Sequence, residues 1–259
     1  MIMSEINFLY YIIMAQTIFI TFGGGTQNYV DAGIRLSKQA YSTNIFTKIL
    51  LYTHHYLHSD ADFWNKHSQF ILNNNRGYGY WLWKPYIIKK TMEQMKDGDI
   101  IFYSDGGCEI SNNKKNQIQA MINNVGNDKL ICSSTKQIEK KWCKMDLFVE
   151  LNMNKDKYLD TEQYQASVII LQVCDKTRQF INEWYELCCN YHFIDDSPSI
   201  LSNNDDFIEN RHDQSIFSLL FKKYEFPVNY TVENIIEIVR NRTGKIYYKI
   251  NSKIQMAFS

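Results

Sequence analysis

The chain has 259 residues, 45% of them hydrophobic and 22% charged, so it is long enough to bury a full core. Because its 28 basic and 28 acidic residues cancel, no net field attracts nucleic acid or an anionic membrane surface, and we expect neither as a partner. The six cysteines form no CxxC pair and no zinc-type spacing with histidine, which favours free thiols in a reducing compartment. These features predict a soluble, cytoplasmic globular protein.

The N-terminal stretch contains an apolar run at residues 8–14, which is too short to span a bilayer. It also lacks the basic region and the small-residue cleavage site of a signal peptide. No later segment approaches transmembrane length, so we expect no membrane span. We interpret residues 1–16 as an N-terminal extension and residues 17–259 as one domain, because no linker, repeat or low-complexity block divides the chain.

The first predicted element is a β-strand at residues 17–22, which is rich in β-branched and aromatic residues and runs into three glycines at 23–25. A helix over residues 28–40 and a second strand over 46–52 follow. This order is typical of a nucleotide-binding half-sheet, although the glycines form neither a GxGxxG motif nor a P-loop.

Residues 73–85 alternate glycines with aromatic residues and end at a proline, which predicts no helix at Lys84. A helix is expected at residues 87–95. Two interpretations of the aromatic stretch are open. Together with Arg76 and Lys84 it suits a sugar ring and an anionic leaving group, or its tryptophans lie in the core at the start of the helix.

The apolar run at residues 100–103 predicts a buried strand in a sheet that is covered on both faces. It stops abruptly at Asp105, which is followed by Gly106 and Gly107. The glycines would let another backbone or a ligand come close to the acid, at the sheet edge where ligands bind in open α/β folds. The alternative is an ordinary Asp-Gly turn.

The second half of the chain continues the alternation of helices and strands. We expect a helix at 116–122, a short strand at 129–133, a charged insertion at 136–153, a buried strand at 163–173 and a helix at 177–189. This order predicts an α/β fold with a mixed sheet flanked by helices, in a single domain.

A polar cluster, Arg211, His212, Asp213 and Gln214, opens an apolar helix at residues 215–220. Free N–H groups and the helix dipole favour negative charge at such a position, so the cluster is chemically usable. The alternative is a capping motif that Asp213 supplies alone. A sheet of the predicted kind can bring this cluster to the same edge as the acid that ends strand 100–103.

Four segments in this order resemble the successive motifs of bacterial and giant-virus glycosyltransferases with the GT-A (Rossmann-like) fold. They are residues 77–88 (GYGYWLWKPYII), 99–109 (DIIFYSDGGCE), 163–167 (QYQAS) and 211–215 (RHDQS). The resemblance spans roughly residues 18–224. It implies a GT-A mixed sheet and a UDP-sugar donor, with Mn²⁺ or Mg²⁺ as cofactor.

By this resemblance Asp105 takes the place of the first acid of a DxD-type metal site. The third position is Gly107, which has no side chain to ligate an ion. Either Glu109 or a C-terminal group then completes the site, or the ion is held loosely. In the second case basic residues would help neutralise the diphosphate, namely Arg240, Arg242 and Lys245.

The resemblance also implies catalytic positions. Asp213 would hydrogen-bond sugar hydroxyls and Gln214 would lie against the β-face of the anomeric carbon, with His212 beside them. Because an amide is a poor nucleophile, retention of configuration would proceed by front-side attack of the acceptor. The donor-binding residues implied are Thr21, Phe22, Gly23, Asn28, Arg76, Trp81, Lys84, Tyr103, Ser104, Asp105 and Gln165.

The resulting hypothesis is a retaining hexosyltransferase that uses a UDP-sugar, with UDP-glucose as the first donor to test. Frequent Asn, Ile and Lys also resemble giant-virus proteins, among which collagen glucosyltransferases are a known type. The acceptor would then be a glycan or a collagen-like glycoprotein, in the host cytoplasm, and a homodimer is left open. The alternative is a non-catalytic nucleotide-sugar-binding protein on the same fold.

Overall fold

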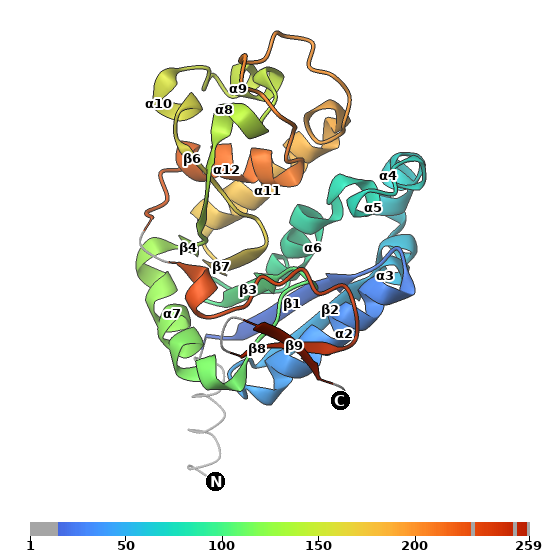
Figure 1. Cartoon of the computed structure of the whole chain (residues 1–259), viewed down its shortest axis with the longest axis vertical. Helices are drawn as coiled ribbons and strands as arrows, with labels where there is room; N and C mark the ends of the chain where they lie inside the picture. The colour runs from blue at the N-terminus through green and yellow to red at the C-terminus, as the bar shows by residue number, and fades with distance from the viewer. Residues whose placement is uncertain (1–14, 229–230, 251–252, 258–259) are drawn as a thin grey trace.

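The computed structural model describes residues 15–228, 231–250 and 253–257. Its centre is a five-stranded mixed sheet with the strand order β2-β1-β3-β7-β4 (Figure 1). Its strands are β1 (Thr17–Gly23), β2 (Lys48–Thr53), β3 (Ile100–Ser104), β4 (Leu130–Ile131) and β7 (Val168–Gln172). β1 is parallel to β2 and to β3, whereas β7 is antiparallel to β3 and to β4. Most of the predicted N-terminal extension, residues 1–14, lies outside the described residues.

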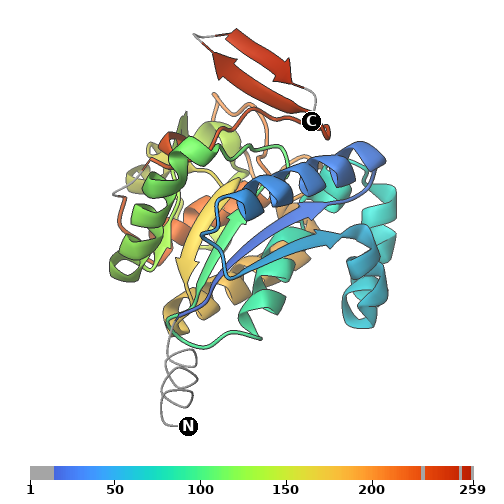
Figure 2. The ribbon, with the colours of Figure 1, turned by 90° about the horizontal axis from the view of Figure 1, so that it is seen from below.

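Helices cover both faces of this sheet (Figure 2). One face packs against α2 (Gln27–Ser42) and α7 (Lys115–Asp128), and the other against α6 (Trp83–Met92), α11 (Asp175–Cys189) and α12 (Asp213–Lys223). In β3 the side chains alternate between the two cores, so the strand is buried on both sides. The predicted mixed α/β sheet flanked by helices is therefore confirmed.

The remaining elements connect these layers or extend them. Two short sheets pair β5 (Ser134–Ile138) with β6 (Glu162–Tyr164), and β8 (Ile246–Ile250) with β9 (Lys253–Ala257). The other helices are α3 (His54–Ser59), α4 (Ala61–Asn73), α5 (Gly77–Tyr80), α8 (Glu139–Trp142), α9 (Met145–Glu150), α10 (Asp156–Leu159) and the 3₁₀ turns η1 (Asn112–Lys114), η2 (Tyr191–Phe193) and η3 (Val232–Asn234). Within the described part of the chain, every helix is too short or too polar to cross a bilayer.

Two predictions about local structure are wrong, and both errors concern the site. Helix α6 begins at Trp83 and includes Lys84, although Pro85 follows. Pro85 lies in the first helical turn, where backbone N–H groups have no intrahelical partner, so its missing N–H costs nothing there.

The predicted strand at 163–173 is in fact two strands, because residues 165–167 leave the ladder between β6 and β7. β6 pairs with β5, whereas β7 belongs to the central sheet. The change of partner frees the backbone N–H and carbonyl groups of Ala166 from strand pairing, and these two groups then serve the site.

A buried arginine on α2 joins the C-terminal segment to the loop after β3. Arg35 is 4% exposed. Its Nη2 donates to the carbonyl oxygens of Gly106 (2.7 Å) and Cys108 (2.8 Å), and its Nη1 donates to those of Asn241 (3.3 Å) and Thr243 (3.0 Å). Figure 1 shows that the segment after η3 passes across the sheet. One guanidinium therefore sets the position of two backbone segments.

We expect Arg35→Met to lower the free energy of unfolding by about 3 kcal/mol, because several buried carbonyl groups lose a charged donor. Urea unfolding of the purified protein measures this directly. The matched control is Lys38→Met on the exposed face of the same helix, which should change stability by less than about 0.5 kcal/mol. Equal losses in the two variants would contradict the role given to Arg35.

Candidate active site

A buried lysine lies between the two acidic positions that the sequence singled out. Lys84 is 3% exposed. Its Nζ is 2.8 Å from Oδ2 of Asp213 and 3.4 Å from Oδ1 of Asp105. It also donates a hydrogen bond to the carbonyl oxygen of Ala166 at 3.2 Å. The two carboxylates, far apart in sequence, are thus brought to one ammonium group.

The first carboxylate is placed by the end of β3. The N–H of Asp105 donates to the carbonyl oxygen of Ser167 (2.8 Å), which continues the pairing of β3 with β7. The hydroxyl of Tyr103 donates to Oδ1 of Asp105. A Cβ atom on Gly106 would lie 3.0 Å from the carbonyl oxygen of Phe22, so glycine there lets the end of β1 approach closely. The carboxylate of Asp105 remains partly exposed, with 32% of its side chain accessible.

The second carboxylate is placed by the start of α12. Asp213 is the first residue of this helix, and Nε1 of Trp184 donates to its carbonyl oxygen at 2.9 Å. The preceding residue, His212, has φ 56° and ψ −128°, a backbone conformation that residues other than glycine seldom adopt. It is held there because its Nδ1–H donates to the carbonyl oxygen of Ile194 (2.7 Å) and its ring stacks on Tyr80. The buried ring of His212 therefore fixes the backbone that leads into Asp213.

Burial and charge set the protonation states of the pair. Burial raises the pKa of the Asp213 carboxyl to about 6, although Lys84 opposes this shift. Burial alone would lower the pKa of Lys84, but the carboxylates of Asp105 and Asp213 outweigh it and raise this pKa. The ammonium therefore stays charged, while Asp213 exchanges its proton near pH 6.

Gln214 is linked to the lysine through the backbone of one residue, Ala166. The N–H of Ala166 points to Oε1 of Gln214 at 3.4 Å, and the carbonyl oxygen of the same residue accepts from Lys84. Nε2 of Gln214 donates to Oε1 of Gln163 at 2.8 Å. The structure thus brings Lys84, Asp105, Asp213 and Gln214 together around the bend at residues 165–167.

The other predicted donor-binding residues lie around this centre in different ways. Phe22 stacks on Trp83 with ring centroids 3.8 Å apart, and Trp81 lies beside the ring of His212. Arg76 is half-exposed and pairs with Asp196 at 3.0 Å. Of the rest, Thr21, Gly23 and Ser104 are buried at the strand ends, Asn28 is exposed on α2, and Gln165 donates to Glu233.

The residues present do not fit a metal site built from Asp105 and Glu109. Glu109 is 4% exposed, accepts a hydrogen bond from Nδ2 of Asn241 (2.6 Å) and lies 3.7 Å from Nη1 of Arg35. These partners give its carboxylate a structural role, unlike the ligand role that the resemblance implied. Among the described residues, no three histidine, cysteine, aspartate or glutamate side chains are grouped so as to hold a metal ion.

The three basic residues predicted near the diphosphate are distributed differently. A Cβ atom on Gly107 would lie 3.3 Å from Cα of Arg240, so the exposed Arg240 flanks the loop that carries Asp105. The guanidinium of Arg242 lies over the ring of Tyr29 at 5.8 Å. Lys245 contributes its carbonyl oxygen, which accepts from Asn241 at 2.6 Å.

The sequence reasoning missed Gln163 and Ala166 as site residues, because it assigned both to an uninterrupted strand. The sequence does contain a feature that indicates this bend. Polar residues at 163, 165 and 167 inside an otherwise apolar run need hydrogen-bond partners when they are buried, and such a requirement indicates a bend or a site.

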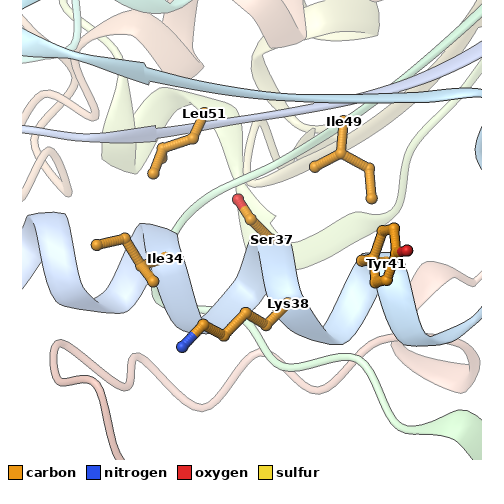
Figure 3. Close-up of a pocket in the computed structure, with 6 residues that line it drawn as sticks. All are labelled: Ile34, Ser37, Lys38, Tyr41, Ile49 and Leu51. Carbon is orange, nitrogen blue, oxygen red and sulfur yellow. The ribbon is translucent and has the colours of Figure 1, made fainter.

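A pocket elsewhere on the surface has different chemistry. It lies between α2 and the edge strand β2, and Figure 3 shows the side chains that line it, Ile34, Ser37, Lys38, Tyr41, Ile49 and Leu51. Its lining is mainly apolar and contains no carboxylate, so we place the candidate active site at Lys84 instead.

No protein-family model and no curated protein matches the chain. Among solved structures, the galactosyltransferase LgtC, in complex with donor and acceptor sugar analogues, is 15% identical with a TM-score of 0.45, over 79% of this chain and 70% of its own. The apo form of mouse xyloside xylosyltransferase 1 is 10% identical with a TM-score of 0.44, over 82% and 84%. Backbones that agree only to this extent assign no role to a residue here.

The raised pKa of Asp213 predicts a pH dependence of stability. Between about pH 4 and pH 6 the folded protein retains a proton that the unfolded chain, with the ordinary pKa of 3.8, has lost. The free energy of unfolding should therefore fall across this range by about 2–3 kcal/mol relative to Asp213→Asn, and level off above it. Urea unfolding of both proteins from pH 4 to pH 7 measures the difference. Parallel profiles would show that Asp213 titrates normally.

Proposed function

We propose that this chain is a nucleotide-sugar-dependent glycosyltransferase of the GT-A type, which transfers a hexose from a UDP-sugar to a hydroxyl acceptor. The observation that carries the proposal is the convergence of Asp105 and Asp213 on Lys84. Two carboxylates held in place by a buried cation provide fixed acceptors for the hydroxyl groups of a polyhydroxylated ligand. The α/β sheet places this cluster beyond the ends of parallel strands β1 and β3, where such folds bind nucleotides.

Each side of the cluster has a distinct part in this proposal. Asp105 is the more exposed acid, and its carboxylate accepts hydrogen bonds from hydroxyl groups on the nucleotide side of the donor. Asp213 is ionised above about pH 6 and accepts from hydroxyl groups of the sugar. Arg240, exposed beside Gly107, supplies positive charge for the diphosphate. A bound Mn²⁺ or Mg²⁺ stays a prediction of the resemblance.

The proposed course of transfer has Gln214, which follows Asp213 at the start of α12, beside the anomeric carbon. The bond between the anomeric carbon and the phosphate oxygen breaks, and its electron pair stays on the departing UDP. The acceptor hydroxyl forms the new bond from the same face, and its proton passes to the departing phosphate oxygen. Gln214 does not bond covalently, and its amide lies against the electron-poor carbon. This course retains the configuration at the anomeric carbon.

The choice of sugar and acceptor is a finer proposal. UDP-glucose is the first donor to test, and a glycan or a collagen-like glycoprotein is the proposed acceptor. One or two hydroxyl contacts separate glucose from its epimers, and these amount to about 1–3 kcal/mol. A cytoplasmic location, the host cytoplasm for a viral protein, and a homodimer remain predictions of the sequence.

A transfer assay with Asp105→Asn tests the proposed function. Wild-type protein is incubated with each of a panel of UDP-sugars, with and without Mn²⁺, and release of UDP is measured. We expect turnover with at least one donor and a loss of kcat/KM of about 100-fold in Asp105→Asn, because a neutral amide replaces the carboxylate in the site.

The control is Asp62→Asn, which makes the same chemical change at an exposed position in the first turn of α4. It should leave turnover unchanged. Equal activity in Asp105→Asn and wild type would remove Asp105 from the site. Calorimetric binding of UDP without UDP release from any donor would favour the non-catalytic binding protein instead.

A further inference from the structure

Helix α12 carries a polar stripe on an otherwise apolar surface. Gln214, Ser218 and Lys222 are four residues apart, so they lie on one face of the helix. Ser218 is fully buried, and the residues between these three are mostly apolar core residues. This face packs against β6. Most buried polar groups in proteins have a hydrogen-bond partner, so the stripe indicates an organised network.

The stripe ends on a buried carboxylate. Glu139, the first residue of α8, is 0% exposed. One of its oxygens accepts from the hydroxyl of Ser218 and from Nζ of Lys222 (2.7 Å), and the other accepts from Nε2 of Gln163 (3.0 Å). Burial raises the pKa of Glu139, but Lys222 and the other donors favour the charged form. Nε2 of Gln163 also donates to the carbonyl oxygen of Trp142 at 3.5 Å, and a carbonyl oxygen can only accept.

That restriction sets the direction of two amides in succession. Gln163 must turn its NH₂ group to Glu139, which leaves its Oε1 facing Gln214. Gln214 must then donate with its own NH₂ group, at 2.8 Å. Its Oε1 consequently points the other way, toward the N–H of Ala166 and the site around Lys84. A free glutamine side chain would present either end, since the two differ little in shape.

We propose that Glu139 and Gln163 are positioning residues that hold the carbonyl oxygen of Gln214 toward the donor sugar. The inference rests on the proposed function. As the anomeric carbon loses its phosphate it becomes positively charged, and an oxygen dipole facing it stabilises that charge. The reversed amide would present N–H hydrogens to the same carbon and would oppose the reaction.

Exchanging Glu139 for glutamine tests this directly, because the new side chain has the same shape but can donate as well as accept. Lys222→Met is added so that no unpaired charge remains buried. In Glu139→Gln/Lys222→Met we expect kcat to fall about tenfold or more while the KM for the donor changes less than about twofold. In a Gln214→Met background the same pair of changes should cost nothing further, since the group they orient is absent.

Ser218→Ala is the matched control, because it removes a hydrogen bond to the same carboxylate and leaves the N–H of Tyr164 without its partner. Glu139 keeps its charge, so the direction of the amides is unchanged. We expect a lower melting temperature with kcat within about threefold of wild type. Activity should therefore follow the direction of the amides and not the stability of the fold.

Two results would overturn the inference while wild-type protein is active. One is an equal fall in kcat from Glu139→Gln/Lys222→Met with and without Gln214. The other is a fall in kcat that tracks melting temperature across all variants, Ser218→Ala included. Wild-type protein that transfers no sugar from any donor would instead overturn the proposed function, and the inference with it.

Discussion

The candidate site depends on one buried ammonium group. Lys84 is held by Asp213, Asp105 and the carbonyl oxygen of Ala166, which come from three separate parts of the chain. Desolvating these charges is costly, and a buried ion pair is weak evidence for stability. Its value here is geometric. With Lys84 in place, the end of β3, the bend before β7 and the start of α12 have one arrangement in which every charge is paired.

Close backbone packing explains why the loop after β3 contains glycines. A Cβ atom on Gly106 would meet the carbonyl oxygen of Phe22 at 3.0 Å, and one on Gly107 would meet Cα of Arg240 at 3.3 Å. The C-terminal segment therefore occupies the space that a side chain at position 107 would need. The guanidinium of Arg35 holds the C-terminal segment next to the loop after β3, because it donates to the carbonyl oxygens of Asn241 and Gly106. A side chain at position 107 would therefore be tightly packed against this segment, and the exposed Arg240 flanks the loop.

How much the sequence could predict varies with the range of the interaction. Strand β3, its polar stop at Asp105 and the sheet's covering of helices follow from apolar runs and turn residues, which act locally. The meeting of Asp105 and Asp213 follows from strand topology. Local rules do not predict which group pairs with each charge. They exclude Lys84 from a helix, although it lies in α6, and the bend at residues 165–167 arises from a change of strand partner. The buried carboxylate of Glu139 lies in the segment 136–153, which the sequence predicted only as a charged insertion.

In the proposed function one donor spans the cluster, with its nucleotide toward Asp105 and its sugar toward Asp213. Calorimetric titration of wild type and Asp213→Asn with UDP and with UDP-glucose tests it most directly. We expect Asp213→Asn to bind UDP within about twofold of wild type but to bind UDP-glucose about tenfold more weakly, since only the sugar loses a charged acceptor. Equal weakening for both ligands, or none for either, would contradict it.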